Sequence, residues 1–212
     1  MIRLRSMWFL AVLTIGITMA GCDKSTEPDS SPPSIPVLQF SAPAQPTTVD
    51  TCQYPAWLYA QAVNEFALLP TYFSQLRPTQ DGNAWVWQIA EGNASMVLRA
   101  EKTSSGDVTW SLVLNGDDGE GTVYNNWTAM QGTTSADGSS GTLTFYQENT
   151  TTVEGEFSWT KNSAGVLTGT LISYTSGVQD TKIVHVSNPN GSGEITVYAR
   201  SGSNWVQTFH AT

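Results

Sequence analysis

The feature that most constrains the fold is a series of short alternating segments, which begins after Pro78 and continues to the C-terminus. Turn-forming pairs such as Asn115-Gly116 and Asp137-Gly138 separate these segments. Within them apolar and polar residues alternate, as in residues 85–89. A period of two is typical of a strand with one buried face, and Asn-Gly and Asp-Gly are typical hairpin turns. The pattern therefore predicts successive antiparallel hairpins.

We expect about nine or ten strands from the spacing of the turns. They are placed near residues 84–90, 95–102, 107–115, 121–131, 140–147, 154–160, 166–174, 180–187, 193–200 and 204–209. A meander with one apolar face covers that face either by closing into a barrel or by curling around a helix. The expected fold is mainly β: an antiparallel meander forming a barrel-like or half-barrel sheet, with an N-terminal helix packed on it.

One stretch, residues 54–77, has the periodicity of a helix. Its apolar residues recur at the spacing of one helix face: Leu58, Ala62, Phe66 and Leu69. Pro55 suits the first turn, and Pro70 interrupts the pattern. We place the helix near residues 55–76 and expect the apolar face to lie on the sheet.

The N-terminal segment has a separate character. Arg3 and Arg5 form a short positive region, and residues 7–20 are almost wholly apolar. At a rise of about 1.5 Å per residue this apolar stretch is too short to span a bilayer. Its length and position are typical of a signal peptide.

The end of this segment, Met19-Ala20-Gly21-Cys22, resembles the lipobox of bacterial lipoproteins, although the family usually has Leu where this chain has Met19. The resemblance covers residues 1–22. It implies cleavage before Cys22, a lipid thioether on Cys22, and usually a fatty acyl group such as palmitate on the new amino terminus. Two or three acyl chains anchor a protein stably. An ordinary secretory signal, cut near Ala20, is the alternative.

The resemblance also implies a location. It places the chain in the bacterial cell envelope as a lipid-anchored membrane protein, at the outer membrane or the cell surface. Asp23 leaves retention at the inner membrane open, because an acidic residue at that position retains lipoproteins there in some bacteria. The membrane is thus the first expected partner, through lipid on Cys22.

The domain organisation follows from these boundaries. Residues 1–21 are the signal peptide, residues 22–50 a Pro/Ser-rich disordered tether, and residues 51–212 a β-rich globular domain. The apolar patch at residues 35–40 is the exception in the tether, and it either docks on the domain or stays with the tether. If Cys22 is acylated, Cys52 has no partner in the chain; otherwise the two could form a disulfide.

Composition excludes some functions. Apolar residues make up 40% of the chain and charged residues 13%, which suits a β-rich secreted domain. Removing Arg3 and Arg5 with the signal peptide leaves seven basic and eighteen acidic residues, a net charge of −11. Such a chain repels phosphate backbones, so we expect no nucleic-acid partner. Anionic headgroups repel it too, so attachment depends on the lipid.

The sequence predicts no catalytic, cofactor or metal site, and we do not expect an enzyme. His185 is expected on the solvent-facing side of its strand, opposite Val184 and Val186, and His210 stands alone near the C-terminus. The acidic residues 115–120 read as a solvated hairpin turn, since they lack the ligand spacing of a calcium loop. Glu154 and Glu156 share a strand face and could resemble a carboxylate pair, but we interpret them as part of the solvent-exposed face of their strand.

Seven of the eight tryptophans follow residue 21, and most fall on predicted strands. Aromatic walls suit a cavity for an apolar ligand, but the same rings can simply fill a core. We therefore expect an envelope binding module for an apolar small molecule or lipid, similar in architecture to the lipoprotein carriers of the bacterial envelope. The alternative is a structural or interaction protein of the envelope with a fully packed core and no ligand. The sequence leaves the oligomeric state open.

Overall fold

A computed structural model describes residues 31–41, 53–68, 72–119 and 121–212. The chain divides into two compact units, Met1–Pro32 and Pro33–Thr212, and the second contains every helix and strand described below. The predicted signal peptide, Cys22 and Cys52 lie outside the described residues. The lipid anchor therefore stays a prediction.

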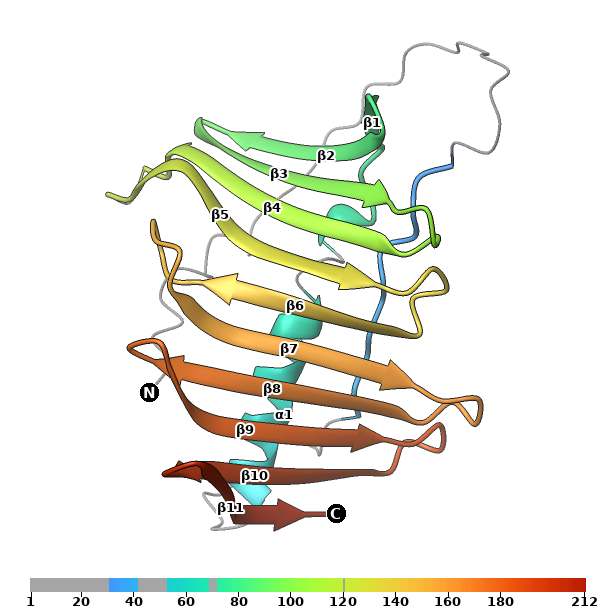
Figure 1. Ribbon diagram of the computed structural model, residues 1–212, viewed down its shortest axis with the longest axis vertical. Helices are drawn as coiled ribbons and strands as arrows, with labels where there is room; N and C mark the ends of the chain where they lie inside the picture. The colour runs from blue at the N-terminus through green and yellow to red at the C-terminus, as the bar shows by residue number, and fades with distance from the viewer. Residues whose placement is uncertain (1–30, 42–52, 69–71, 120) are drawn as a thin grey trace. The chain divides into compact units, whose positions relative to one another are not determined.

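The second unit is built on a single sheet of eleven antiparallel strands, paired in the order in which they occur in the chain (Figure 1). The strands are β1 (Thr79–Asp81), β2 (Ala84–Glu91), β3 (Asn93–Lys102), β4 (Val108–Asp117), β5 (Val123–Thr134), β6 (Ser140–Tyr146), β7 (Val153–Lys161), β8 (Leu167–Thr175), β9 (Val178–Ser187), β10 (Gly193–Ser201) and β11 (Asn204–Ala211). The predicted antiparallel meander is confirmed. Closure into a barrel is not found, because β1 and β11 stand at opposite ends of the strand order.

Each of the ten predicted strands overlaps one observed strand, from β2 to β11. The additional strand, β1, has three exposed polar or charged residues, Thr79, Gln80 and Asp81. Such a strand has no apolar alternation, so the pattern used to find the others could not detect it.

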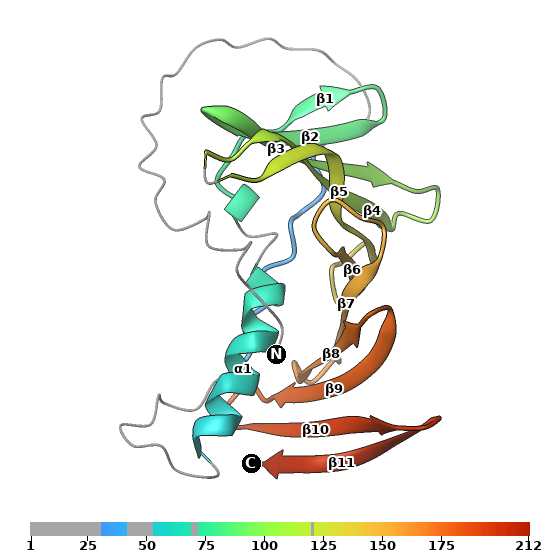
Figure 2. The same ribbon diagram turned by 90° about the vertical axis from the view of Figure 1, so that its left-hand side faces the viewer.

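The sheet is curved, and one face is concave (Figure 2). Alternation along the strands directs the large apolar side chains to this face; in β7, for example, Phe157 and Trp159 are buried while Glu156 and Ser158 between them are only partly buried. Directly paired residues share a face, so Leu143, Phe157 and Leu171 form one buried row across β6, β7 and β8. The core lies on the concave side.

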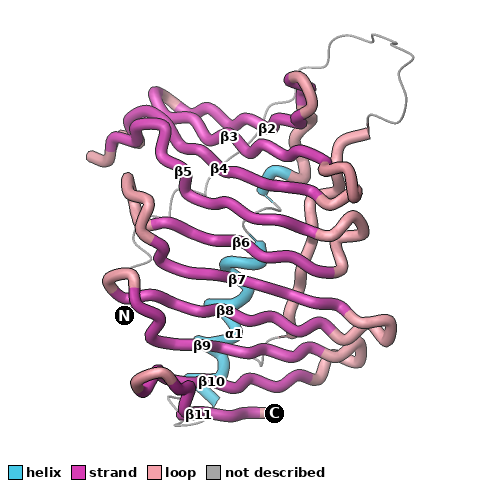
Figure 3. Tube along the Cα trace, viewed as in Figure 1, coloured by secondary structure: helices cyan, strands magenta, loops and turns pink. Residues whose placement is uncertain are grey.

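Helix α1 (Gln53–Leu68) lies on the concave side and contacts β7, β8, β9, β10 and β11 (Figures 2 and 3). The predicted contact face is wrong in part, because Leu58 is 45% exposed. The buried side chains are small ones at helical spacing: Ala56, Ala60, Val63 and Ala67. Small side chains let the helix axis approach the sheet closely, and this geometry rotates Leu58 toward solvent.

Residues 33–41, here called the strap, form an extended segment without regular secondary structure (Figure 3). Leu38 and Phe40 are buried, so the apolar patch in the expected tether docks on the domain. The amide of Phe40 donates to Asn64 Oδ1 of α1 at 3.1 Å, and Asn64 Nδ2 donates back to the Phe40 carbonyl at 3.3 Å. The strap is thereby fixed to the helix as well as to the sheet.

Candidate functional site

The concave face of β2 to β5 carries a cluster of large side chains. Trp87 of β2 and Trp110 of β4 have ring centroids 6.0 Å apart at an interplanar angle of 34°. The indole N–H of Trp110 donates to Thr134 Oγ1 at 3.0 Å, which satisfies a polar atom that would otherwise be costly to bury. Leu98, Leu112 and Met130 are buried on the same face; their strands carry them there through the alternation predicted from the sequence.

On β6 to β8 the concave face carries a second aromatic group that meets the strap. Phe157 stacks on Trp159 with centroids 5.7 Å apart, and Phe40 approaches Phe157 edge-on at 6.1 Å. Gly169 makes room for the Phe40 ring, since a Cβ at Gly169 would lie 2.5 Å from Phe40 Cζ. The strap therefore covers this aromatic group.

His185 was expected on the solvent-facing side of its strand, and that prediction is wrong. Its side chain is 1% exposed, on the concave face of β9, and its ring lies 5.2 Å from the Phe40 ring. Burial lowers the pKa of His185, and a hydrogen bond to the backbone of Ser41 acts in the opposite direction. In the described part of the chain Nδ1 of His185 has no hydrogen-bond partner. The ring is therefore a buried contact for the strap.

Two serines extend this contact. The amide of Ser41 donates to Ser187 Oγ at 3.0 Å, and the two hydroxyls are also hydrogen-bonded to each other. His185 and Ser187 therefore hold the C-terminal end of the strap from neighbouring inward-facing positions on β9. This arrangement positions a peptide segment.

Trp127 lies where the pairing of β4 and β5 is irregular. The register shifts between Leu112 and Val113 and again between Leu114 and Gly116. Trp127 stacks on Tyr124 with centroids 5.6 Å apart and an interplanar angle of 14°. Its indole N–H is buried and, within the described residues, has no hydrogen-bond partner.

The outer face of the sheet is rich in hydroxyl groups. A shallow groove of about 610 Å³ lies there, and its lining includes Thr133, Thr142, Ser158 and Thr170, which pair directly across β5 to β8. Asp107 is the one charged residue of the lining. Most residues of the lining carry a hydroxyl group, and Trp159 is the one aromatic residue among them.

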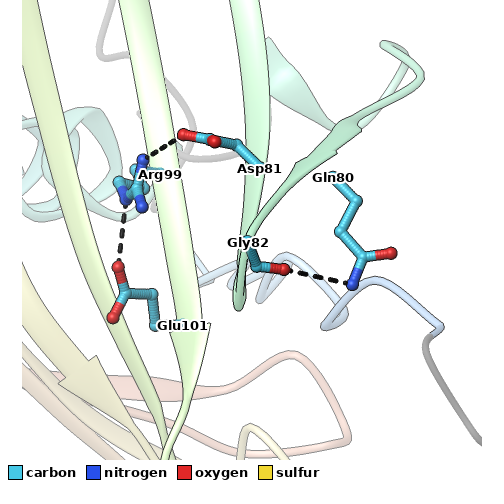
Figure 4. Close-up of polar contacts among 5 residues, drawn as sticks. All are labelled: Gln80, Asp81, Gly82, Arg99 and Glu101. Carbon is cyan, nitrogen blue, oxygen red and sulfur yellow. Dashed lines mark hydrogen bonds and ion pairs between the residues drawn. The ribbon is translucent and has the colours of Figure 1, made fainter.

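At the β1 end of the sheet, a small ion-pair network joins β1 to β3 across β2 (Figure 4). Arg99 of β3 donates through its guanidinium to Asp81 of β1 at 2.9 Å and to Glu101 at 3.0 Å. The Arg99 side chain is 40% exposed, so solvent screens both pairs. The network is a surface feature of this edge and lies away from the buried aromatic groups.

Of the predicted turn at residues 115–120, Asn115 to Asp117 form the end of β4, Asp118 and Gly119 follow it, and Glu120 lies outside the described residues. Asp117 accepts a hydrogen bond from the Gly119 amide at 2.8 Å, and Asp118 accepts one from the Thr122 amide at 3.0 Å. These carboxylates bond to the backbone of the turn. No group of three or more His, Cys, Asp or Glu side chains suited to a metal ion occurs among the described residues.

The remaining titratable groups are dispersed. His210 Nδ1 lies 3.2 Å from Thr196 Oγ1 and 3.8 Å from Glu194 on an exposed edge. Glu156 accepts a hydrogen bond from the Tyr174 hydroxyl at 2.7 Å, and partial burial raises the pKa of Glu154. The His210 and Glu194 side chains are 43% and 50% exposed, so solvent screens their contact.

No family model, curated protein or solved structure matches this chain. In the part of the chain that the structure describes, no helix has the length and apolar character needed to cross a membrane.

Proposed function

We propose that the protein is a lipid-anchored envelope protein whose sheet acts as a half-barrel. In this proposal an apolar ligand or lipid binds against the concave face of β2 to β5. We propose a binding role and not a catalytic one, with attachment to the membrane of the bacterial envelope through acyl chains on Cys22. The outer membrane or the cell surface is the proposed site, with inner-membrane retention through Asp23 as the alternative.

The observation that carries the binding role is the aromatic and aliphatic character of the concave face of β2 to β5. Helix α1 contacts β7 to β11, and the strap packs on the same region through Phe40. The tryptophan pair, Trp87 and Trp110, lies beyond these strands on β2 and β4. Aromatic and aliphatic walls with few polar groups are what acyl chains and other apolar ligands bind.

A second function is favoured by a different observation. Trp87 is 3% exposed and Trp110 is 4% exposed, as in a packed core. A protein with this face fully occupied by its own chain would act through its surface, as a structural or interaction component of the envelope. The experiment below separates the two functions.

The test extracts the full mature protein from envelopes in mild detergent and analyses it by native mass spectrometry. We expect a non-covalent apolar ligand in addition to the mass of any covalent acyl groups. Trp110→Ala should reduce the bound fraction at least about threefold by removing aromatic contact area. Thr142→Ala, on the outer face, is the matched control and should leave the bound fraction unchanged.

The outcomes separate binding from anchoring. A protein that carries acyl groups but no non-covalent ligand would support the packed-core function. A mature N-terminus other than Cys22, or an unmodified Cys22, would remove the anchor from the proposal and leave the binding role to be judged on the ligand alone.

A further inference from the structure

The two ends of the sheet present very different edges. β1 has three residues, all exposed, and includes Asp81. β11 has eight residues, Asn204–Ala211, without proline and without Asp, Glu, Lys or Arg. Edge strands are commonly blunted by shortness, charge or proline because their free N–H and C=O groups invite pairing. β1 is blunted by its shortness and its charge. β11 has neither feature, and its one irregularity is a bulge.

A bulge in β11 determines which side chains face which way. The register with β10 shifts between Val197 and Tyr198, so that Val197 pairs with Phe209 and Tyr198 with Gln207, and Thr208 has no direct counterpart. Pairing with β10 gives the inward-facing set as Asn204, Val206, Phe209 and Ala211, and the outward-facing set as Trp205, Gln207 and His210. The ring centroids of Phe209 and of Tyr59 in α1 are 5.6 Å apart, which agrees with an inward direction of the Phe209 side chain.

This arrangement makes β11 complementary to itself. In an antiparallel pair, directly opposed residues must share a face. In a regular strand, successive side chains point to opposite faces of the sheet. If the twofold axis passed between two residues of such a strand, the opposed residues would lie on opposite faces, and the condition would fail. The extra residue at the bulge, Thr208, reverses which alternate residues face inward in the C-terminal half of β11. The opposed residues then share a face along the whole strand.

We propose that β11 is a dimerisation edge, on which β11 of a second copy of this chain pairs antiparallel about an axis between Gln207 and Thr208. The opposed pairs are Asn204 with Ala211, Trp205 with His210, Val206 with Phe209, and Gln207 with Thr208, each from opposite copies. Inward residues meet inward residues, and Trp205 and His210 meet on the outer face. The proposal does not depend on the proposed ligand or on the lipid anchor.

Charge on the outer face agrees with this orientation. Near Trp205, Lys182 Nζ lies 5.2 Å and Arg200 Cζ 5.1 Å from the indole ring centroid. Near the other end of β11, Glu194 lies 3.8 Å from His210. Antiparallel pairing about a twofold axis sets the basic end of one copy beside the acidic end of the other.

The geometry also favours a second copy of β11 over the other free edge of the sheet. Pairing of β11 with β1 of a neighbouring molecule would be heterologous and would build rings or open filaments. β1 offers three residues, and its Asp81 is engaged with Arg99. Pairing of β11 with β11 is isologous, uses eight residues from each chain, and closes at a dimer.

The test measures the mass of the purified full chain in detergent by native mass spectrometry over a concentration series. Wild type is expected to be dimeric. Gln207→Lys/Thr208→Lys and Gln207→Glu/Thr208→Glu each place like charges directly opposite one another at the axis. Each variant alone should raise the dimer dissociation constant at least about tenfold. Thr79→Lys/Gln80→Lys, on β1, is the matched control and should remain dimeric.

Mixing distinguishes a lost interface from a misfolded chain. An equimolar mixture of the lysine and glutamate variants should form a heterodimer, because opposite charges then meet at the axis. A monomeric wild type, open-ended polymers, charged variants that stay dimeric, or a mixture that stays monomeric would each overturn the proposal.

Discussion

The two halves of the sheet close their concave face in different ways. Over β7 to β11, small residues lie where α1 and the strap pack on the sheet. They are the buried alanines of α1, and Gly169 beneath Phe40. Over β2 to β5 the same face is built from bulky side chains, with Trp87 and Trp110 in the centre. Small residues mark the places where a segment of the chain approaches the sheet. The bulky half is where we propose that something other than α1 or the strap is bound.

The largest effect is expected from the half that the chain closes itself. Phe157→Ala removes a fully buried ring that contacts both Trp159 and Phe40, and should lower the free energy of unfolding by about 3–5 kcal/mol. Denaturant titration measures the loss, which should be the same before and after delipidation. Val178→Ala, at a position 65% exposed, is the control and should change stability little. A Phe157→Ala loss that shrinks on delipidation would erase the distinction between the halves.

The next effect tests whether the strap requires the space at Gly169. Gly169→Ala places a methyl group 2.5 Å from Phe40 Cζ and should cost about 1–3 kcal/mol by forcing the ring to shift. Phe40→Leu in the same chain removes the collision, so the double variant should lose less than the sum of the two single losses. Strict additivity, measured by the same titration, would show that Phe40 does not occupy this position in solution.

A pH series examines the buried histidine of the same half. Because the pKa of His185 is lower in the folded than in the unfolded chain, the unfolded chain binds the proton more readily. Stability is therefore complete above the ordinary histidine pKa of about 6.5 and falls as pH decreases through it, by about 1.4 kcal/mol for each unit of pKa difference. His185→Phe should remove this loss in thermal melts between pH 7.5 and 5. His210→Gln, on an exposed edge, should preserve it.

The smallest effect concerns the other end of the sheet. Asp81→Asn removes the ion pair between Arg99 and Asp81, whose side chains are 40% and 71% exposed. The loss should stay below about 1 kcal/mol and should disappear in high salt, since exposed ion pairs are weak and screened. A larger, salt-independent loss would mean that the β1 edge contributes to the core of the β2 to β5 half.

Sequence alternation was sufficient to predict the strands and most of their buried faces, because apolar residues at every second position leave few choices. It failed where packing partners come from elsewhere in the chain. His185 is buried because Phe40, far away in sequence, covers it, while Val184 and Val186 beside it are only partly buried. Leu58 is exposed because the sheet accepts the alanine face of α1. Neither fact has a local signature in the sequence.

The sequential strand order has a consequence for how the molecule assembles. Each strand pairs with its predecessor, so hairpins can form one after another as the chain emerges, with only short loops to close. Ser41, in contrast, meets Ser187, 146 residues later. The N-terminal strap is therefore synthesised before the sheet but packs on it last. Pulse-labelled hydrogen exchange should show its amides protected only after those of β9, a vectorial order in which the opening segment of the chain completes the fold.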